Sequence, residues 1–104
     1  MSLNTQTMKT LLVKPTAELA KKFKALDHDT RYRIVSFLLE NGESKFKDVS
    51  MEVTGSKAAV AYHLDILVNS GLLEKRYERE GREYSHYRVS DDAVELFSKL
   101  GLTV

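Results

Sequence analysis

The sequence predicts a mainly α-helical fold with a small β-hairpin (α+β), in the order α-α-α-α-β-β-α. Two observations lead to this prediction. Apolar residues recur at helical spacing in five separate segments after residue 15. Between residues 73 and 89 the spacing changes to a loose alternation of apolar and polar residues around a glycine, which indicates two strands joined by a turn.

The length and composition fit one small domain. The chain has 104 residues, of which 42% are hydrophobic and 30% charged, and its formal net charge is +1. Any binding of nucleic acid must therefore come from local placement of charge. The absence of cysteine excludes disulfides and thiolate metal sites. No apolar run approaches the ~20 residues that span a bilayer, and no signal peptide is recognised, so we expect a cytoplasmic protein without a membrane partner.

The first two helices are predicted from their boundaries and their apolar spacing. Pro15 stops any helix from running through it, and Thr16 is a suitable N-cap for the first helix. Residues 27–30 form a break with capping residues, and Gly42 ends the second helix. The apolar positions of the two helices are Leu19, Ala20, Phe23, Leu26, Ile34, Val35 and Leu38.

The third and fourth helices are separated by a tight turn at residues 54–56. Ser44 is the expected cap of a short third helix, Ser56 caps the fourth, and Gly71 ends it. The apolar positions are Phe46, Val49 and Val53 in the third helix and Ala59, Val60, Leu64, Leu67 and Val68 in the fourth.

A hairpin turning at Gly81 and a last helix complete the chain. Ser90 is the expected cap of this helix, which has one apolar face. The residues of that face are Ala93, Leu96, Phe97 and Leu100. A short helix, a tight turn and a longer helix form a helix-turn-helix, and a hairpin directly after it is a wing. We therefore expect a winged helix-turn-helix domain at residues 16–104, with terminal helices for dimerisation. Residues 1–15 are expected to form an arm that is loose or is ordered at a dimer interface.

Two segments resemble a known family. They are ALDHDTRYRIVSFLLENGE and SKAAVAYHLDILVNSGLLEKR, and they are similar to winged-helix repressors of the arsenical-resistance-repressor (ArsR-like) type over residues 23–89. The matching positions are Thr30, Arg31, Arg33, Ile34, Ser56, Val60, His63, Leu64, Leu67, Gly71 and Leu72. The resemblance implies a homodimer with its interface on the first and last helices. It also implies that the fourth helix enters the major groove of DNA.

The sequence also departs from the family pattern. Lys45 and Lys47 stand where metal-sensing members carry a Cys-x-Cys pair, and the last helix has no histidine. The usual glycine of the helix-turn-helix appears as Thr54, with Gly55 next to it. Alanines replace most of the polar residues that face the groove; they are Ala58, Ala59 and Ala61. We therefore expect no metal and no cofactor.

The candidate DNA contacts lie on the helix at residues 56–69, at the start of the short third helix and on the wing at residues 79–82. They are Ser56, Lys57, Ala58, Ala61, Tyr62, Lys45, Lys47, Arg79 and Arg82. Helix N-termini and cationic side chains bind phosphate, and alanine methyls pack on thymine methyls. Each group has an alternative reading: the alanines could admit another helix, the wing charges could be cross-strand ion pairs, and the lysines could form a solvated face. Arg31 is expected to be structural or near phosphate, and His63 to be packed or to touch phosphate.

The candidate dimer interface is apolar and comes from the first and last helices. Its residues are Leu19, Phe23, Leu96, Phe97 and Leu100. Pairing the last-helix residues with the apolar patch of the arm, Leu11, Leu12 and Val13, across a two-fold axis would space two recognition helices about one DNA turn apart. The alternative is that they close the core of a single chain.

The predicted function is that of a homodimeric, sequence-specific regulator of transcription that binds double-stranded DNA. The alternative is a winged helix that binds another protein and not DNA. Dependence of binding on salt separates the two, because only binding to DNA releases many counterions. The sequence contains no phosphate loop, nucleophile motif or spaced metal ligands, so we expect no enzyme activity. It identifies no small-molecule effector.

Overall fold

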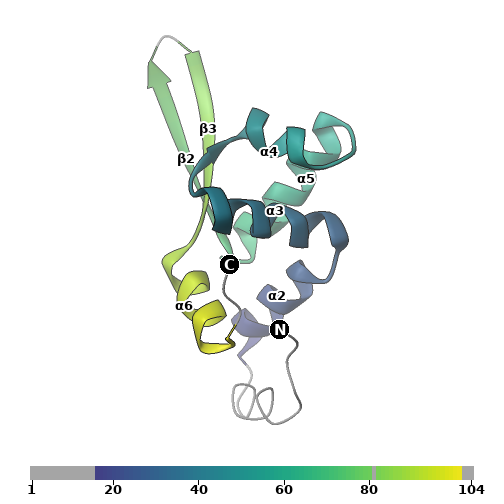
Figure 1. The fold of residues 1–104 in the computed structure, drawn as a ribbon, viewed down its shortest axis with the longest axis vertical. Coiled ribbons are helices and arrows are strands. Elements are labelled where there is room, and N and C mark those ends of the chain that lie inside the picture. Colours follow the sequence, from purple (N-terminus) through teal and green to yellow (C-terminus); the bar gives the residue numbers. More distant parts are fainter. Residues whose placement is uncertain (1–15, 81, 102–104) are drawn as a thin grey trace.

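The computed structural model describes residues 16–80 and 82–101. For residues 80 and 82–84 it describes the backbone but not the side chains. The arm expected at residues 1–15, including Pro15, lies outside the described residues. The elements are the helices α2 (Ala17–Leu26), α3 (Asp29–Asn41), α4 (Phe46–Glu52), α5 (Lys57–Asn69) and α6 (Asp91–Lys99), and the strands β1 (Ser44–Lys45), β2 (Leu73–Glu80) and β3 (Arg82–Val89). Figure 1 shows the hairpin of β2 and β3 projecting beyond the helices. None of the described helices is long and apolar enough to cross a membrane.

The helix starts follow from short side chains that cap them. The hydroxyls of Thr16, Ser56 and Ser90 each accept a hydrogen bond from a backbone N–H three residues later, at 3.0–3.1 Å. These caps confirm three predicted boundaries. Gly42 follows α3 with φ +76°, a conformation that favours glycine, and confirms the predicted end of that helix.

The predicted break before α3 is shorter than expected. The imidazole of His28 accepts a hydrogen bond from the backbone N–H of Thr30 at 3.2 Å, so it acts as the N-cap. The helix therefore begins at Asp29. Histidine is not among the usual capping residues, which is why the sequence did not single it out.

The prediction that Ser44 caps the third helix is wrong. Ser44 and Lys45 form β1, which pairs antiparallel with Tyr87 and His86 of β3. The Ser44 hydroxyl donates to the carbonyl oxygen of Gly42 at 2.9 Å, and α4 starts after Lys45 without a side-chain cap. Backbone pairing with β3 holds Ser44 in a strand. The described sheet therefore has three strands in the order β1-β3-β2.

The hairpin turns at the predicted place. Residues of β2 and β3 pair from Leu73 with Val89 to Glu80 with Arg82, which places the turn between Glu80 and Arg82. The base of the hairpin is buried, because Leu73 and Tyr87 are only 2% and 3% exposed. The outer part of the hairpin therefore extends from a base fixed in the core.

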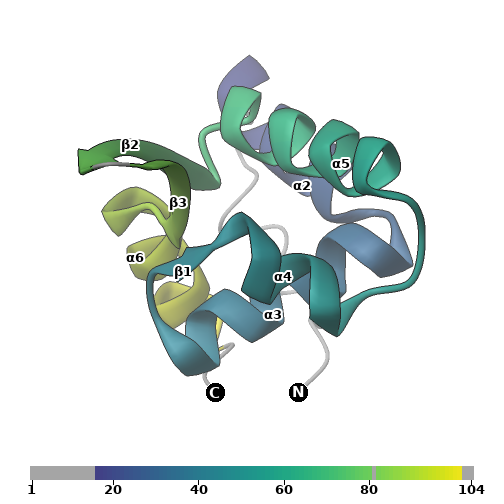
Figure 2. The ribbon, with the colours of Figure 1, turned by 90° about the horizontal axis from the view of Figure 1, so that it is seen from above.

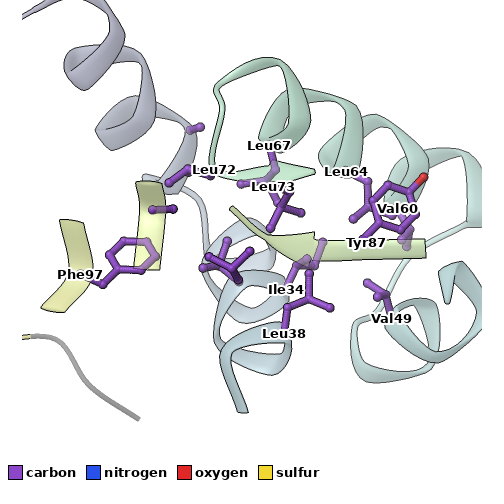
Figure 3. Close-up of a cluster of buried hydrophobic side chains, with 14 residues drawn as sticks. Ile34, Leu38, Val49, Val60, Leu64, Leu67, Leu72, Leu73, Tyr87 and Phe97 are labelled. Atoms are coloured by element: carbon purple, nitrogen blue, oxygen red, sulfur yellow. The ribbon is translucent and has the colours of Figure 1, made fainter. Parts of the chain in front are cut away.

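The core lies between α3, α4, α5 and the base of the hairpin (Figure 3). Fully buried side chains from these elements and from the connection between α5 and β2 are Ile34, Leu38, Val49, Val60, Leu64, Leu67, Leu72 and Leu73. Burying one aliphatic side chain of this size contributes about 1.5–3 kcal/mol. The three residues that α5 contributes lie on one face, so the core fixes which face of α5 points outward.

The last helix packs partly into the same core. Ala93 and Phe97 belong to the core cluster, and Leu100 is only 7% exposed. Phe97 and Leu100 therefore fit the alternative, in which this face closes the core of the single chain. Three other residues proposed for the dimer interface keep part of their surface accessible; they are Leu19, Phe23 and Leu96.

Candidate DNA-binding surface

The outward face of α5 is formed by small and polar residues. Val60, Leu64 and Leu67 are buried, so the 3.6-residue period places Ala58 and Tyr62 on the opposite side. Tyr62 is 62% exposed. Lys57, Ala58 and Asp65 are also exposed, and Ala61 is half-buried. With 13 residues, α5 is about 20 Å long and carries few large side chains on this face.

The turn before α5 depends on Gly55. Its φ is +126°, which L side chains rarely adopt, whereas Thr54 has no such conformation. The glycine that the turn requires therefore stands one position after the place where the family pattern carries it. Both helices of the helix-turn-helix, α4 and α5, form on either side of this turn.

The predicted lysine contacts lie at the start of α4. Lys45 is in β1 and Lys47 is in the first turn of α4, and both are exposed. Lys45 therefore starts from the sheet and not from a helix. Figure 2 shows β1 leading into α4, with the hairpin on the side of β1 and α5 on the other side, at the upper right. The structure thus places the lysines on neighbouring elements of the helix-turn-helix and the wing.

Two arginines of the hairpin form ion pairs. The Arg76 guanidinium donates to both oxygens of Glu43, at 3.2 and 2.8 Å. This pairing lowers the pKa of Glu43 below its usual value, mainly through the hydrogen bonds from Arg76. Arg88 contacts Glu74 at 2.6 Å and Asp91 at 3.2 Å. The reading of the wing charges as cross-strand ion pairs therefore describes Arg88 with Glu74, whereas Arg76 pairs with Glu43 outside the hairpin.

The tip of the wing carries the arginines proposed to contact DNA. Arg79 is exposed near the end of β2. The side chain of Arg82 lies outside the described residues. Its backbone pairs with Glu80, so it starts on the far side of the turn from Arg79.

A buried histidine joins the wing to the helical part of the chain. His86 in β3 is 8% exposed, and its Nε2 lies 2.7 Å from a carboxylate oxygen of Glu78. Its Nδ1 lies 3.9 Å from the carboxylate of Glu43, which is in the connection between α3 and β1. Together with Arg76, these residues hold the hairpin against that connection. Sequence reasoning missed this network because Glu43 and Arg76 are 33 positions apart.

A second cluster links α3 to α5. The Arg31 Nη1 lies 3.3 Å from the Nδ1 of His63, and the ring centroids of His63 and His28 are 4.5 Å apart. Burial, followed by the charges of His28 and Arg31, lowers the pKa of His63 below 6.5. The Arg31 Nε also donates to the carbonyl oxygen of Ala25 at 2.7 Å. Arg31 thus has a structural role, and His63 is packed beside it.

Comparison with known proteins gives relatives of one kind. The model of bacterial regulatory proteins of the arsR family matches residues 28–75. The HTH-type transcriptional regulator MJ1325 of Methanocaldococcus jannaschii is 32% identical over 81 residues, which cover 78% of this chain and 88% of that protein. This chain belongs to the ArsR family. Like the members of this family and the relative from Methanocaldococcus jannaschii, it is a regulatory protein and not an enzyme.

Two further relatives support the same family. A homologue of the cadmium resistance transcriptional regulatory protein CadC of Staphylococcus aureus is 36% identical over 77 residues, 74% of this chain. The chain spans about three fifths (61%) of the length of that relative. A homodimeric winged helix-turn-helix DNA-binding domain from Mycobacterium bovis, a possible ArsR-family regulator, has a TM-score of 0.68 at 25% identity, covering 98% of this chain and 88% of its own. The winged helix-turn-helix fold and the ArsR family predicted from the sequence are confirmed.

The metal site of some ArsR members has no counterpart in the described residues. The protein has no cysteine, and Lys45 and Lys47 stand at the positions of the Cys-x-Cys pair. In residues 16–80 and 82–101, no three histidine, aspartate or glutamate side chains are grouped so that they could hold a metal ion. The available chemistry is that of hydrogen-bond donors, small apolar groups and paired charges.

Proposed function

We propose that this ArsR-family protein is a sequence-specific DNA-binding regulator of transcription that acts as a homodimer. The helix at residues 56–69, which comprises Ser56 and α5, lies in the major groove, and the wing at residues 79–82 contacts the minor groove or its phosphates. The observation that carries the proposal is the exposed, small-residue face of α5, fixed outward by the core beside a projecting hairpin. A major groove about 12 Å wide accepts a helix with such a face.

The candidate contacts divide into those that position the protein and those that read bases. Lys45, Lys47 and Arg79 carry charges suited to phosphates. Lys57 and Tyr62 extend from α5 toward base edges or phosphates. Ala58 and Ala61 offer methyl groups that pack on thymine methyls but donate no hydrogen bonds. Direct reading of bases is therefore modest, and much of the specificity comes from DNA shape and from the wing.

The proposed dimer uses the terminal helices of the domain. Leu19 and Phe23 on α2 and Leu96 on α6 are half-buried in the single chain, and Val94 on α6 is 46% exposed. Phe97 and Leu100 support this surface from within. A two-fold axis through it presents two α5 helices to successive major grooves, about 34 Å apart. The dimer then occupies a nearly palindromic site.

The test is selection of bound duplexes from a random pool at low and moderate salt. We expect a two-fold symmetric motif and an affinity that falls steeply with salt. Tyr62→Ala and Arg82→Ala should each weaken binding about tenfold, as expected for loss of one good contact. Lys99→Gln on α6, which changes a charge away from the proposed surface, is the matched control and should bind like the original protein.

The opposite result would favour the protein-interaction alternative. If no motif is enriched and no duplex binds even at low salt, the alanine face of α5 is a docking surface for another protein. Retention of a protein partner at high salt would then be the expected property, since apolar contacts are little affected by salt.

A further inference from the structure

Three side chains meet where α3 begins, beside the middle of α5. They are His28 at the N-cap of α3, Arg31 in its first turn and His63 on α5. The two imidazole centroids are 4.5 Å apart, and Arg31 approaches His63 to 3.3 Å. Arg31 is held in place by its bond to the carbonyl of Ala25. We call these residues the α3–α5 cluster.

The hydrogen bonds of the cluster fix which nitrogen of each ring can donate. The backbone N–H of Thr30 donates to the Nδ1 of His28, and the Arg31 guanidinium donates to the Nδ1 of His63. Both partners can only donate, so both Nδ1 atoms accept. In the neutral rings the proton is therefore on Nε2. The cluster offers two imidazole N–H donors next to a permanent guanidinium charge, a combination suited to an anion.

The cluster continues the outward face of α5. The ring of Tyr62 meets the ring of His63 edge-on, with centroids 5.6 Å apart. Tyr62 is on the exposed side of α5, and His28 is exposed at the end of the same row of rings. A row of polar rings thus runs from the proposed groove-facing side of α5 to the start of α3. The free backbone N–H groups of a helix N-terminus add to its attraction for an anion.

We propose that the α3–α5 cluster binds one phosphodiester group of the DNA backbone at the edge of the groove that α5 enters. The proposal rests on the proposed DNA binding and assigns His28, Arg31 and His63 to it. The ligand is a phosphodiester because the row leads directly from the face that meets the bases. This contact fixes how far α5 turns in the groove, and it carries no sequence information of its own.

Acidic neighbours limit the charge of this site. Asp27 and Asp29 flank His28 and are exposed. They offset part of the positive potential of Arg31, so directional hydrogen bonds contribute more than net charge. Replacing His63 should therefore weaken binding with little change in the dependence on salt, because its lowered pKa keeps the ring neutral and a neutral ring displaces no counterion.

The experiment combines protein variants with duplexes in which a single phosphate has been made neutral. The probe is a selected duplex in which one phosphate at a time is replaced by methylphosphonate. For the unchanged protein, we expect replacement to weaken binding about tenfold at one position in each half-site, outside the recognised bases, besides the phosphates contacted by Lys45, Lys47 and Arg79. His28→Ser keeps a capping side chain and removes the imidazole. This variant should bind the normal duplex about tenfold more weakly than the original protein. Methylphosphonate at that position should not weaken its binding further. His63→Leu should behave in the same way.

The outcomes separate this proposal from the proposed function. Suppose that the unchanged protein binds a selected duplex, but each variant loses as much affinity as the unchanged protein at every replaced phosphate. Then the cluster does not bind DNA, and the proposed function stands. If no duplex binds, both fail. The control variant Lys99→Gln should lose as much affinity as the original protein when the same phosphate is replaced. Unfolding temperatures of the free variants identify any loss of the fold, and the two variants change the cluster from different helices.

Discussion

Gly55 shows how one residue sets the turn between α4 and α5. Its φ of +126° is costly for any residue with a Cβ, although the nearest side-chain atom would be 3.7 Å away. The cost is thus in the backbone and not in crowding. Gly55→Ala should lower the free energy of unfolding by about 1–3 kcal/mol in urea denaturation. Thr54→Ala, at the exposed neighbour, should change it by less than about 0.5 kcal/mol. Equal stability of the two variants would contradict this account of the turn.

His63 should make stability depend on pH. Its pKa is lowered in the folded chain, first by burial and then by His28 and Arg31. As the pH falls through the ordinary value of 6.5, the unfolded chain takes up a proton that the folded chain still excludes. The free energy of unfolding should therefore fall as the pH is lowered below 6.5, and level off below the lowered pKa of the folded state.

The contribution of His63 is measured by comparison with His63→Gln. The amide oxygen of glutamine can still accept from Arg31, but the side chain does not titrate. Urea denaturation between pH 8 and pH 5 should give a flatter profile for this variant. Profiles of the same shape would mean that His63 does not cause the pH dependence.

Among the elements, the wing depends on an anchor near its middle, where Arg76 pairs with His86. Glu43, Arg76, Glu78 and His86 connect both strands of the hairpin to the end of α3. Glu43→Gln should loosen this connection and speed amide hydrogen exchange in the outer half of the hairpin about two- to fivefold, as for loss of one exposed ion pair. Amides in the middle of α5 should not change. Glu95→Gln, which removes the exposed pair between Glu95 and Lys99, is the control.

The elements also show what the sequence could and could not predict. The caps at Thr16, Ser56 and Ser90 depend on contacts three residues away, so a local pattern contains them. The strand β1 has two residues and depends on pairing with β3, more than 40 positions later, and no local pattern marks it. Similarly, sequence reasoning predicts separate roles for His63 and Arg31, but their contact spans 32 positions.

At the scale of the whole molecule, the proposed DNA binding depends on the proposed dimer. Leu96→Glu would place a charge on the half-buried surface of α6, and burying an unpaired charge in an interface is costly. We expect this variant to sediment as a monomer at concentrations where the original protein is a dimer. It should also bind a palindromic duplex at least tenfold more weakly. Glu95→Gln on the same helix should remain a dimer. A dimeric Leu96→Glu protein would place the interface elsewhere.

The three-stranded sheet has a consequence for the order in which the protein forms. The helix-turn-helix lies between β1 and β2, and both strands hydrogen-bond to β3. During synthesis, α5 leaves the ribosome before β3, the strand that pairs with β1 and β2 on either side of the helix-turn-helix. A nascent chain that stops before Arg82 would contain every residue of α5 but would lack the Tyr87 side chain that packs into the core. The unit proposed to read DNA is thus completed by a segment that is made after the unit itself.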